Sequence, residues 1–179
     1  MADNTPSAGE NTTPFYELTD ETVEVCGHIL HRIRALRDIN EDVHAGDLGG
    51  FVESTENLDA SHGAWVSDNA CVYGSARVYD SAWVFDRAWV SDRARVFDRA
   101  CVYDRACVYG DACVYGDAWV SDHAWVYGNA RVYGEAWVGG DARVEGHAEV
   151  CGSATIHGTD HIGGTARIDG DVEVCEGES

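Results

Sequence analysis

The sequence predicts an all-β solenoid, a rod of many short parallel strands, on three observations. From Val66 to Val174 an aliphatic residue stands at every sixth position, without a single insertion or deletion. Two positions before each of these residues stands alanine, from Ala64 to Ala166, except at Asp160. A fixed period of six is that of hexapeptide β-helices. Six is not a multiple of 3.6, so in a helix the valines would spiral around every side.

Each hexapeptide is expected to form a very short strand followed by a bend. In Ala82-Trp83-Val84-Phe85 inward and outward side chains alternate, which is typical of a strand. The next two positions hold Asp or Gly and then a polar residue, a pair that favours a turn. A flat array of hairpins fits poorly, because every repeat has the same polarity and the same turn.

The Val-x-x-x-Ala-x unit resembles the repeat of the hexapeptide-repeat, left-handed parallel β-helix family, with an aliphatic residue first and a small residue fifth. The resemblance covers about two thirds of the chain and implies a single-stranded triangular β-helix with 18 residues in each coil. Residues 51–176 then make about seven coils. The left hand rests on the resemblance alone, because ordinary crossover connections favour the right hand.

The residues that precede the core valines test the triangle, because a step of 18 sorts them into three sets. The first set is Trp65, Trp83, Cys101, Trp119 and Trp137. The second set is Cys71, Trp89, Cys107 and Trp125. The third set is Arg77, Arg95, Cys113, Arg131 and Arg167, beside Tyr79, Phe97, Tyr115 and Tyr133. A period of six alone would not separate tryptophan from arginine, so the pattern favours three faces.

The chain before the rod is expected to form a disordered tail and a cap. Residues 1–13 are rich in Asn, Thr, Ser, Pro and Gly, a composition typical of disorder. Residues 14–50 are the predicted cap, with aliphatic residues around Gly27-His28 that indicate a β-hairpin. Solenoids need such a cover on the first coil. Counting back by six from Ala64 reaches Leu58 and Val52, so the β-helix is expected to span 51–176, with a tail at 177–179.

The predicted cap supports a narrower resemblance. The stretch from Tyr16-Glu17-Leu18-Thr19 to Leu36-Arg37-Asp38, followed by residues 46–53, resembles the leader of small bacterial and phage hexapeptide proteins. These YdcK-like proteins carry the descriptions polymer-forming or transferase. Because such descriptions rest on fold analogy, the resemblance implies little about mechanism.

Charge and composition exclude several partner classes. The chain has no lysine; its twelve arginines stand against 32 carboxylates, for a formal net charge of −20. This charge argues against binding to nucleic acid or to an anionic membrane. There is neither a long apolar run nor a basic, then apolar, leader, so we expect a cytoplasmic protein with reduced cysteines.

No metal or cofactor site is expected from the titratable residues. Cys101, Cys107 and Cys113 point outward on three different faces and cannot reach one zinc ion. The metal-dependent enzymes of the fold gather histidines from neighbouring coils, but no two histidines after residue 122 are 18 apart. Those histidines are His123, His147, His157 and His161.

Two acidic features remain open to more than one interpretation. A ladder of aspartates at a step of 18 could bind calcium, but Arg87 and Arg105 follow it and are expected to neutralise it. The ladder is Asp68, Asp86, Asp104 and Asp122. Asp160, which interrupts the alanine column, is either a bulge or hydrogen-bonded aspartate, or part of a small acid–histidine site with His157 and His161.

The resulting functional hypothesis is a non-catalytic interaction rod without a cofactor or catalytic residue. Its outward aromatic ladders either stack on one another and on Arg77, Arg95 and Arg131, or bind a second copy or another protein. The predicted binding residues are Trp65, Trp83, Trp119, Trp137, Trp89, Trp125, Tyr79, Phe97, Tyr115 and Tyr133. The resemblance to the fold's enzymes implies a trimer. The alternative is a coenzyme A-dependent hexapeptide acyltransferase, although such enzymes usually extrude loops between coils.

Overall fold

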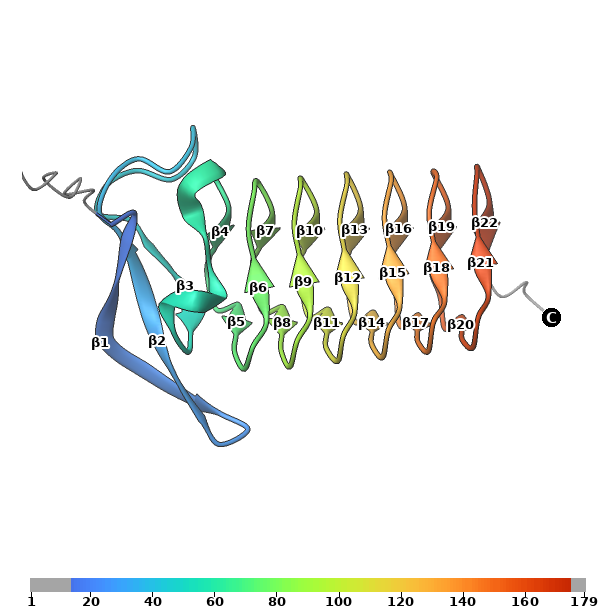
Figure 1. Cartoon of the computed structure of the whole chain (residues 1–179), viewed down its shortest axis with the longest axis horizontal. Helices are drawn as coiled ribbons and strands as arrows, with labels where there is room; N and C mark the ends of the chain where they lie inside the picture. Colours follow the sequence, from blue (N-terminus) through green and yellow to red (C-terminus); the bar gives the residue numbers. More distant parts are fainter. Residues whose placement is uncertain (1–13, 175–179) are drawn as a thin grey trace, which may run out of the picture.

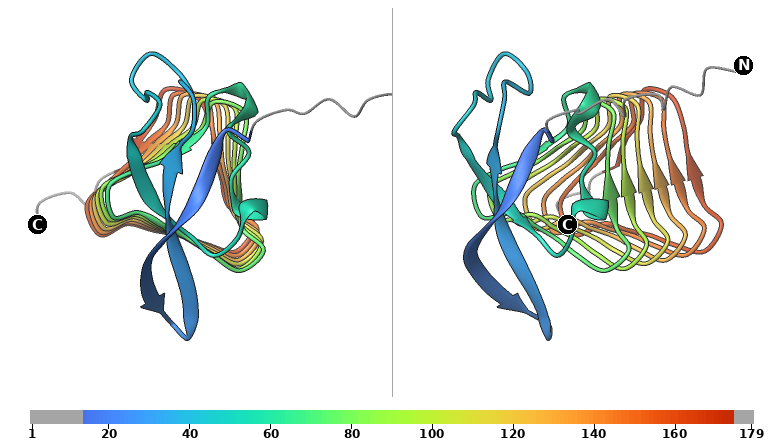
Figure 2. Two further views of the ribbon diagram at one scale, coloured as in Figure 1. Left: turned by 90° about the vertical axis from the view of Figure 1, so that its left-hand side faces the viewer. Right: turned by 60° about the vertical axis from the view of Figure 1, so that its left-hand side comes forward.

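A computed structural model of the chain describes residues 14–174 and shows a rod with an antiparallel hairpin across one end (Figure 1). Viewed along its axis, the rod is a triangular prism (Figure 2). The parallel β-solenoid and the hairpin cap predicted from the sequence are confirmed. The expected tails at 1–13 and 177–179 lie outside the described residues.

Three sheets form the sides of the prism, and we call them face 1, face 2 and face 3. Face 1 consists of β4 (Trp65–Val66), β7 (Trp83–Val84), β10 (Cys101–Val102), β13 (Trp119–Val120), β16 (Trp137–Val138), β19 (Thr155–Ile156) and β22 (Glu173–Val174). Face 2 contains β5 (Cys71–Val72), β8 (Trp89–Val90), β11 (Cys107–Val108), β14 (Trp125–Val126), β17 (Arg143–Val144) and β20 (His161–Ile162). Face 3 consists of β6 (Arg77–Val78), β9 (Arg95–Val96), β12 (Cys113–Val114), β15 (Arg131–Val132), β18 (Glu149–Val150) and β21 (Arg167–Ile168).

Neighbouring strands of each face pair in parallel, and each strand bonds to the strand one coil further along the chain. On face 1, for example, Cys101 is in register with Trp119. The backbone N–H of each outward residue donates to a carbonyl of the next coil, as from Cys101 to Ala118 at 2.9 Å. The three sets found at a step of 18 are therefore the three faces.

Small and medium aliphatic side chains fill the interior of the prism, apart from Asp160 in the alanine column. The alanines from Ala64 to Ala154 and the aliphatic residues from Val66 to Ile156 are all fully buried. Each buried valine contributes about 1.5 kcal/mol or more. In the last described coil Ala166 and Val172 are exposed, because no further coil of described residues packs against them along the rod axis.

Each corner turns at a residue in the left-handed region, which explains why that position is Asp or Gly. The seven corner aspartates have φ between 56° and 60°. The carboxylates of six of them also accept backbone N–H bonds from the next coil, as from Gly110 to Asp92 and from Gly116 to Asp98, both at 3.0 Å. Aspartate thus satisfies a donor that the turn leaves free.

The cap continues face 2 past the first coil. Strands β1 (Tyr16–Val25) and β2 (His28–Ala35) form the hairpin, with positive φ at Cys26 and Gly27. Strand β3 (Leu48–Val52) pairs antiparallel with β2 and parallel with β5. The hairpin therefore covers a strand edge that would otherwise be open at this end.

Counting back by sixes gives the wrong register for the first coil. Leu58 bridges Val78, and Val52 pairs with Val72. Each of these pairs is separated by 20 residues along the chain, two more than the 18 of a regular coil. Leu58 and Val52 therefore extend the valine columns and not the alanine column. The two additional positions fall in the segment of the 3-10 turn η2 (Ala60–His62), which the sequence period did not reveal.

Polar and glycine residues complete the cover of the first coil. Asn57, at the end of the 3-10 turn η1 (Thr55–Asn57), is 1% exposed and donates to the carbonyls of Gly74 at 3.1 Å and Ala76 at 2.9 Å. At Gly50 a β-carbon would lie 2.7 Å from the Ala70 carbonyl oxygen. Only glycine allows the chain to pass this closely over the coil.

The narrow interior leads to a prediction about overpacking. We expect Ala106→Leu to lower the free energy of unfolding by about 1–3 kcal/mol, because the prism has no room for a larger side chain. Arg105→Leu, the matched change at the exposed neighbour, should cost less than about 0.5 kcal/mol. Urea denaturation measures both. Equal losses would contradict the inward assignment of the alanine column.

Glu53 links the cap to the second coil, accepting hydrogen bonds from His28 Nδ1 at 2.9 Å and from the Gly74 N–H at 2.7 Å. These bonds hold the pKa of the Glu53 carboxyl below its ordinary value of 4.5. A lowered pKa stabilises the fold above the unfolded value, and this contribution disappears as the pH falls through the lowered pKa.

We therefore expect Glu53→Gln to be less stable than the wild type at pH 7, with the difference vanishing below the lowered pKa. Melting temperatures measured between pH 7 and pH 3 test this expectation, with Glu56→Gln, an exposed neighbour in η1, as the control. A Glu53→Gln difference that persists unchanged at acid pH would mean that the carboxylate charge does not carry the contribution.

Candidate interaction faces

Four of the six tryptophans are the most exposed aromatic side chains of the rod. Trp119 and Trp137 on face 1 are 50% and 41% exposed, and Trp89 and Trp125 on face 2 are 39% and 42% exposed. Trp83 is half-buried. These side chains form one ladder on each of two neighbouring faces, as the step of 18 predicts.

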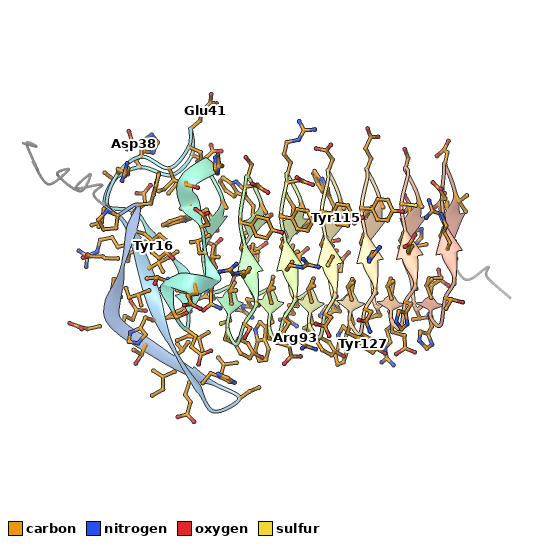
Figure 3. All side chains as sticks on the ribbon, viewed as in Figure 1. Tyr16, Asp38, Glu41, Arg93, Tyr115 and Tyr127 are labelled. Atoms are coloured by element: carbon orange, nitrogen blue, oxygen red, sulfur yellow. The ribbon has the colours of Figure 1, made fainter. Side chains whose placement is uncertain are left out.

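Trp65 does not belong to this exposed set, contrary to the sequence-based expectation. It is 1% exposed and lies in the core cluster. The ring of Tyr16 from β1 packs edge-on against it at 6.3 Å, and the Tyr16 hydroxyl donates to the Leu58 carbonyl at 2.8 Å (Figure 3). The cap thus converts an outward position of the first coil into an interior one.

Diagonal contacts hold the exposed tryptophans in place. The ring of Tyr103 packs edge-on against Trp119 at 6.0 Å, and that of Tyr109 against Trp125 at 6.1 Å. Both pairs join a residue after a core valine to the residue 16 positions later. The Trp137 indole N–H makes the same diagonal contact, donating to Ser121 Oγ at 2.9 Å. Ser121 is consequently 1% exposed, although its position in the repeat is an outward one.

The aromatic residues that follow the core valines stack directly on one another. On face 3, Tyr79, Phe97, Tyr115 and Tyr133 form a column with ring centroids 4.9 Å apart and planes within 6° of parallel. Tyr115 lies within this column, near the middle of the rod (Figure 3). Tyr109 and Tyr127 form a similar pair at 4.9 Å. Ring stacking, one of the two interpretations of the aromatic ladders, is therefore present for these residues.

The expected stacking of these rings on arginines is not present. Among residues 14–174, the arginines that lie over aromatic rings are Arg32, Arg37 and Arg143, the last 5.6 Å from the Trp125 ring. Arg77, Arg95 and Arg131 make no such contact within this range.

The carboxylates of the aspartate ladder at one corner accept hydrogen bonds from backbone N–H groups of the next coil. Each of its first three carboxylates lies 3.4 Å from the N–H of the next aspartate, and Asp122 accepts from Gly140 at 3.0 Å. Arg87 and Arg105 line the same surface hollow as the first three aspartates, but among the described residues they make no ion pair with the ladder. The cross-coil ion pairs at the other corners are Arg93–Asp111 at 2.6 Å and Arg99–Asp117 at 2.7 Å.

Asp160 takes the place of an alanine without disturbing the strands. His161 stays in register with Arg143, so there is no bulge. The aspartate is 8% exposed, and its Oδ2 is buried without a hydrogen-bond partner among the described residues. His157 and His161 do not form a site with it: they bond to Glu173 at 3.0 Å and Glu145 at 2.7 Å, respectively. Both pairs use the diagonal step of 16.

The described cysteines are unpaired thiols. Burial raises the pKa of Cys101 and Cys107, and that of Cys71 to about 11. Since the thiolate is the nucleophile and metal ligand, these thiols are weakly reactive near neutral pH. Within residues 14–174, no group of three or more His, Cys, Asp or Glu side chains is arranged to hold a metal ion.

Comparison with known proteins gives one partial match. A family model described as the YdcK beta solenoid repeat matches residues 124–140, the segment that contains β14, β15 and β16. Together with the parallel sheets, this match supports a β-solenoid repeat protein. No curated protein matches the chain. Over the described part of the chain, no helix has the length and apolar character needed to cross a membrane.

Proposed function

We propose that the protein is a non-catalytic interaction rod that associates laterally with further copies of itself through the tryptophans of faces 1 and 2. The observation that carries the proposal is the exposure of four tryptophans, 39–50%, on two neighbouring faces. Exposed apolar patches rimmed by polar residues mark interaction sites of proteins. Tryptophan is also the residue most enriched where protein interfaces gain their affinity.

The diagonal contacts prepare these side chains for binding. Tyr103, Tyr109 and Ser121 hold Trp119, Trp125 and Trp137, so their rings lose less conformational freedom on association. Ordering a free side chain at an interface costs about 0.5–1.5 kcal/mol. The tryptophan faces are therefore rigid surfaces.

Magnitudes favour an assembly in which each copy uses both faces. The exposed parts of two tryptophans on one face amount to roughly 150–200 Å², worth about 4–5 kcal/mol. Association costs about 4–15 kcal/mol before any gain appears. One face alone gives weak binding, whereas a closed ring engages face 1 and face 2 of every copy. A trimer is the smallest ring of this kind.

The charge of −20 opposes association and gives it a specific salt dependence. Added salt screens repulsion between exposed carboxylates, whereas burial of tryptophan is insensitive to moderate salt. We therefore expect association to strengthen with ionic strength.

No feature of the described residues favours the acyltransferase alternative. From β4 to β22 the strands follow one another every six residues, so no loop extends between coils in this range. Such loops are what the resemblance to these enzymes leads one to expect around coenzyme A.

Light scattering across a concentration series tests the proposal. We expect the wild type to reach multiples of 19.4 kDa, and Trp119→Arg/Trp137→Arg to raise the apparent dissociation constant at least about tenfold, a change of about 1.4 kcal/mol. The control is Ser75→Arg/Asn129→Arg, which adds the same charge at exposed corners.

Circular dichroism should show that both double variants keep their β structure. A wild type that stays monomeric at every concentration and salt would overturn the proposal. An equal loss in the corner control would also overturn it, because charge rather than tryptophan burial would then govern association.

A further inference from the structure

A cavity of about 640 Å³ lies at the N-terminal end of face 3, away from the tryptophan ladders. The start of β1 passes over it, and the first two coils form its floor. Its apolar lining includes Phe15, Leu58 and Val78. Its charged lining is Glu56, Asp59, Arg77 and Arg95. A cavity of this size accommodates a small organic molecule.

The stacked aromatic column of face 3 ends at this cavity. Tyr79, its first ring, lines the cavity and is covered by Phe97 on one side, at 4.9 Å and 4°. The chain position that would continue the column is Asp59, because Leu58 bridges Val78. Asp59 has no ring, and its carboxylate accepts the Ser61 N–H at 3.0 Å. The second side of the Tyr79 ring is therefore not covered by a further member of the column.

Two guanidinium groups without an ion pair among the described residues line the cavity together with that ring. Arg77 and Arg95 are paired neighbours on β6 and β9, and both are exposed. Among residues 14–174 neither forms an ion pair with a carboxylate, and Arg95 Nη2 lies 3.2 Å from Cys113 Sγ. In contrast, Arg131 and Arg167 on the same face both pair with Glu149. Guanidinium groups without a partner bind carboxylates strongly and in a defined geometry.

We propose that this cavity binds a planar aromatic anion carrying one carboxylate. Its ring stacks on Tyr79 as the next member of the column, and its carboxylate is held by Arg77 and Arg95. Phe15, the apolar lining residue that stays partly exposed, covers the rest of the ring. Glu56 and Asp59 on the cavity wall disfavour ligands with several negative charges.

Titration of the full chain with 2-naphthoate, followed by calorimetry and ligand-observed NMR, tests the inference. We expect saturable binding that Tyr79→Ala weakens at least tenfold and Arg77→Gln/Arg95→Gln weakens at least tenfold. The neutral analogue 2-naphthalenemethanol should bind at least tenfold more weakly than 2-naphthoate. Two controls on the same face should leave the affinity unchanged: Tyr115→Ala, inside the column, and Arg131→Gln.

Several results would overturn the inference. One is the absence of saturable binding at millimolar 2-naphthoate. Another is equal affinity for the neutral analogue, which would remove the role of the arginines. An equal loss in Tyr115→Ala would show that the column as a whole, rather than its uncovered end, governs binding. Melting curves of each variant separate these outcomes from unfolding.

Discussion

The structure depends on the match between a narrow interior that holds only small and medium aliphatic columns and the backbone bonds that stack one coil on the next. Alanine and valine fill the interior from Ala64 to Ile156, and each outward N–H donates to a carbonyl of the next coil. Because both features repeat at every coil, every outward position becomes a member of a column. Outward side chains one coil apart are therefore neighbours, and the surface of the rod consists of columns of such side chains.

The aromatic side chains of the rod differ in how far their contacts within the columns leave them exposed. Rings at a repeat distance of 4.9 Å cover one another and become part of the scaffold, as in the column from Tyr79 to Tyr133. Trp119, Trp125 and Trp137, which contact the preceding coil diagonally, by contrast stay 41–50% exposed. The difference separates aromatic residues that stabilise the rod from those available to a partner.

The ends of the columns are chemically distinct from their middles. At the first coil the hairpin, Asn57 and Gly50 cover the backbone, and Tyr16 buries Trp65. The same end leaves Tyr79 without a further ring of its column and, among the described residues, Arg77 without an ion pair at contact distance. At the end of the repeat, residues therefore have surroundings that differ from those of the equivalent residues in the other coils.

The period of the sequence predicts the coil and the three faces, because these follow from local alternation and a constant step, and the aliphatic residues around Gly27-His28 predict the hairpin. It does not predict the burial of Trp65, which depends on where the cap places Tyr16. The register of Leu58 was missed because two additional positions interrupt the period in the first coil. The step of 18 does not reveal the glutamate partners of His157 and His161, because these pairs join residues 16 positions apart.

Trans-hydrogen-bond scalar couplings, measured by NMR on isotope-labelled protein, test the coil most directly. The structure requires couplings from the amides of Cys101 and Tyr103 to the carbonyls of Ala118 and Val120, which lie on the neighbouring strand of face 1 one coil further along the chain. Couplings of these amides to carbonyls of any other strand would contradict the three-sided coil. Such a result would also contradict the assignment of the faces, the columns and the exposed tryptophans, because all three follow from the three-sided coil.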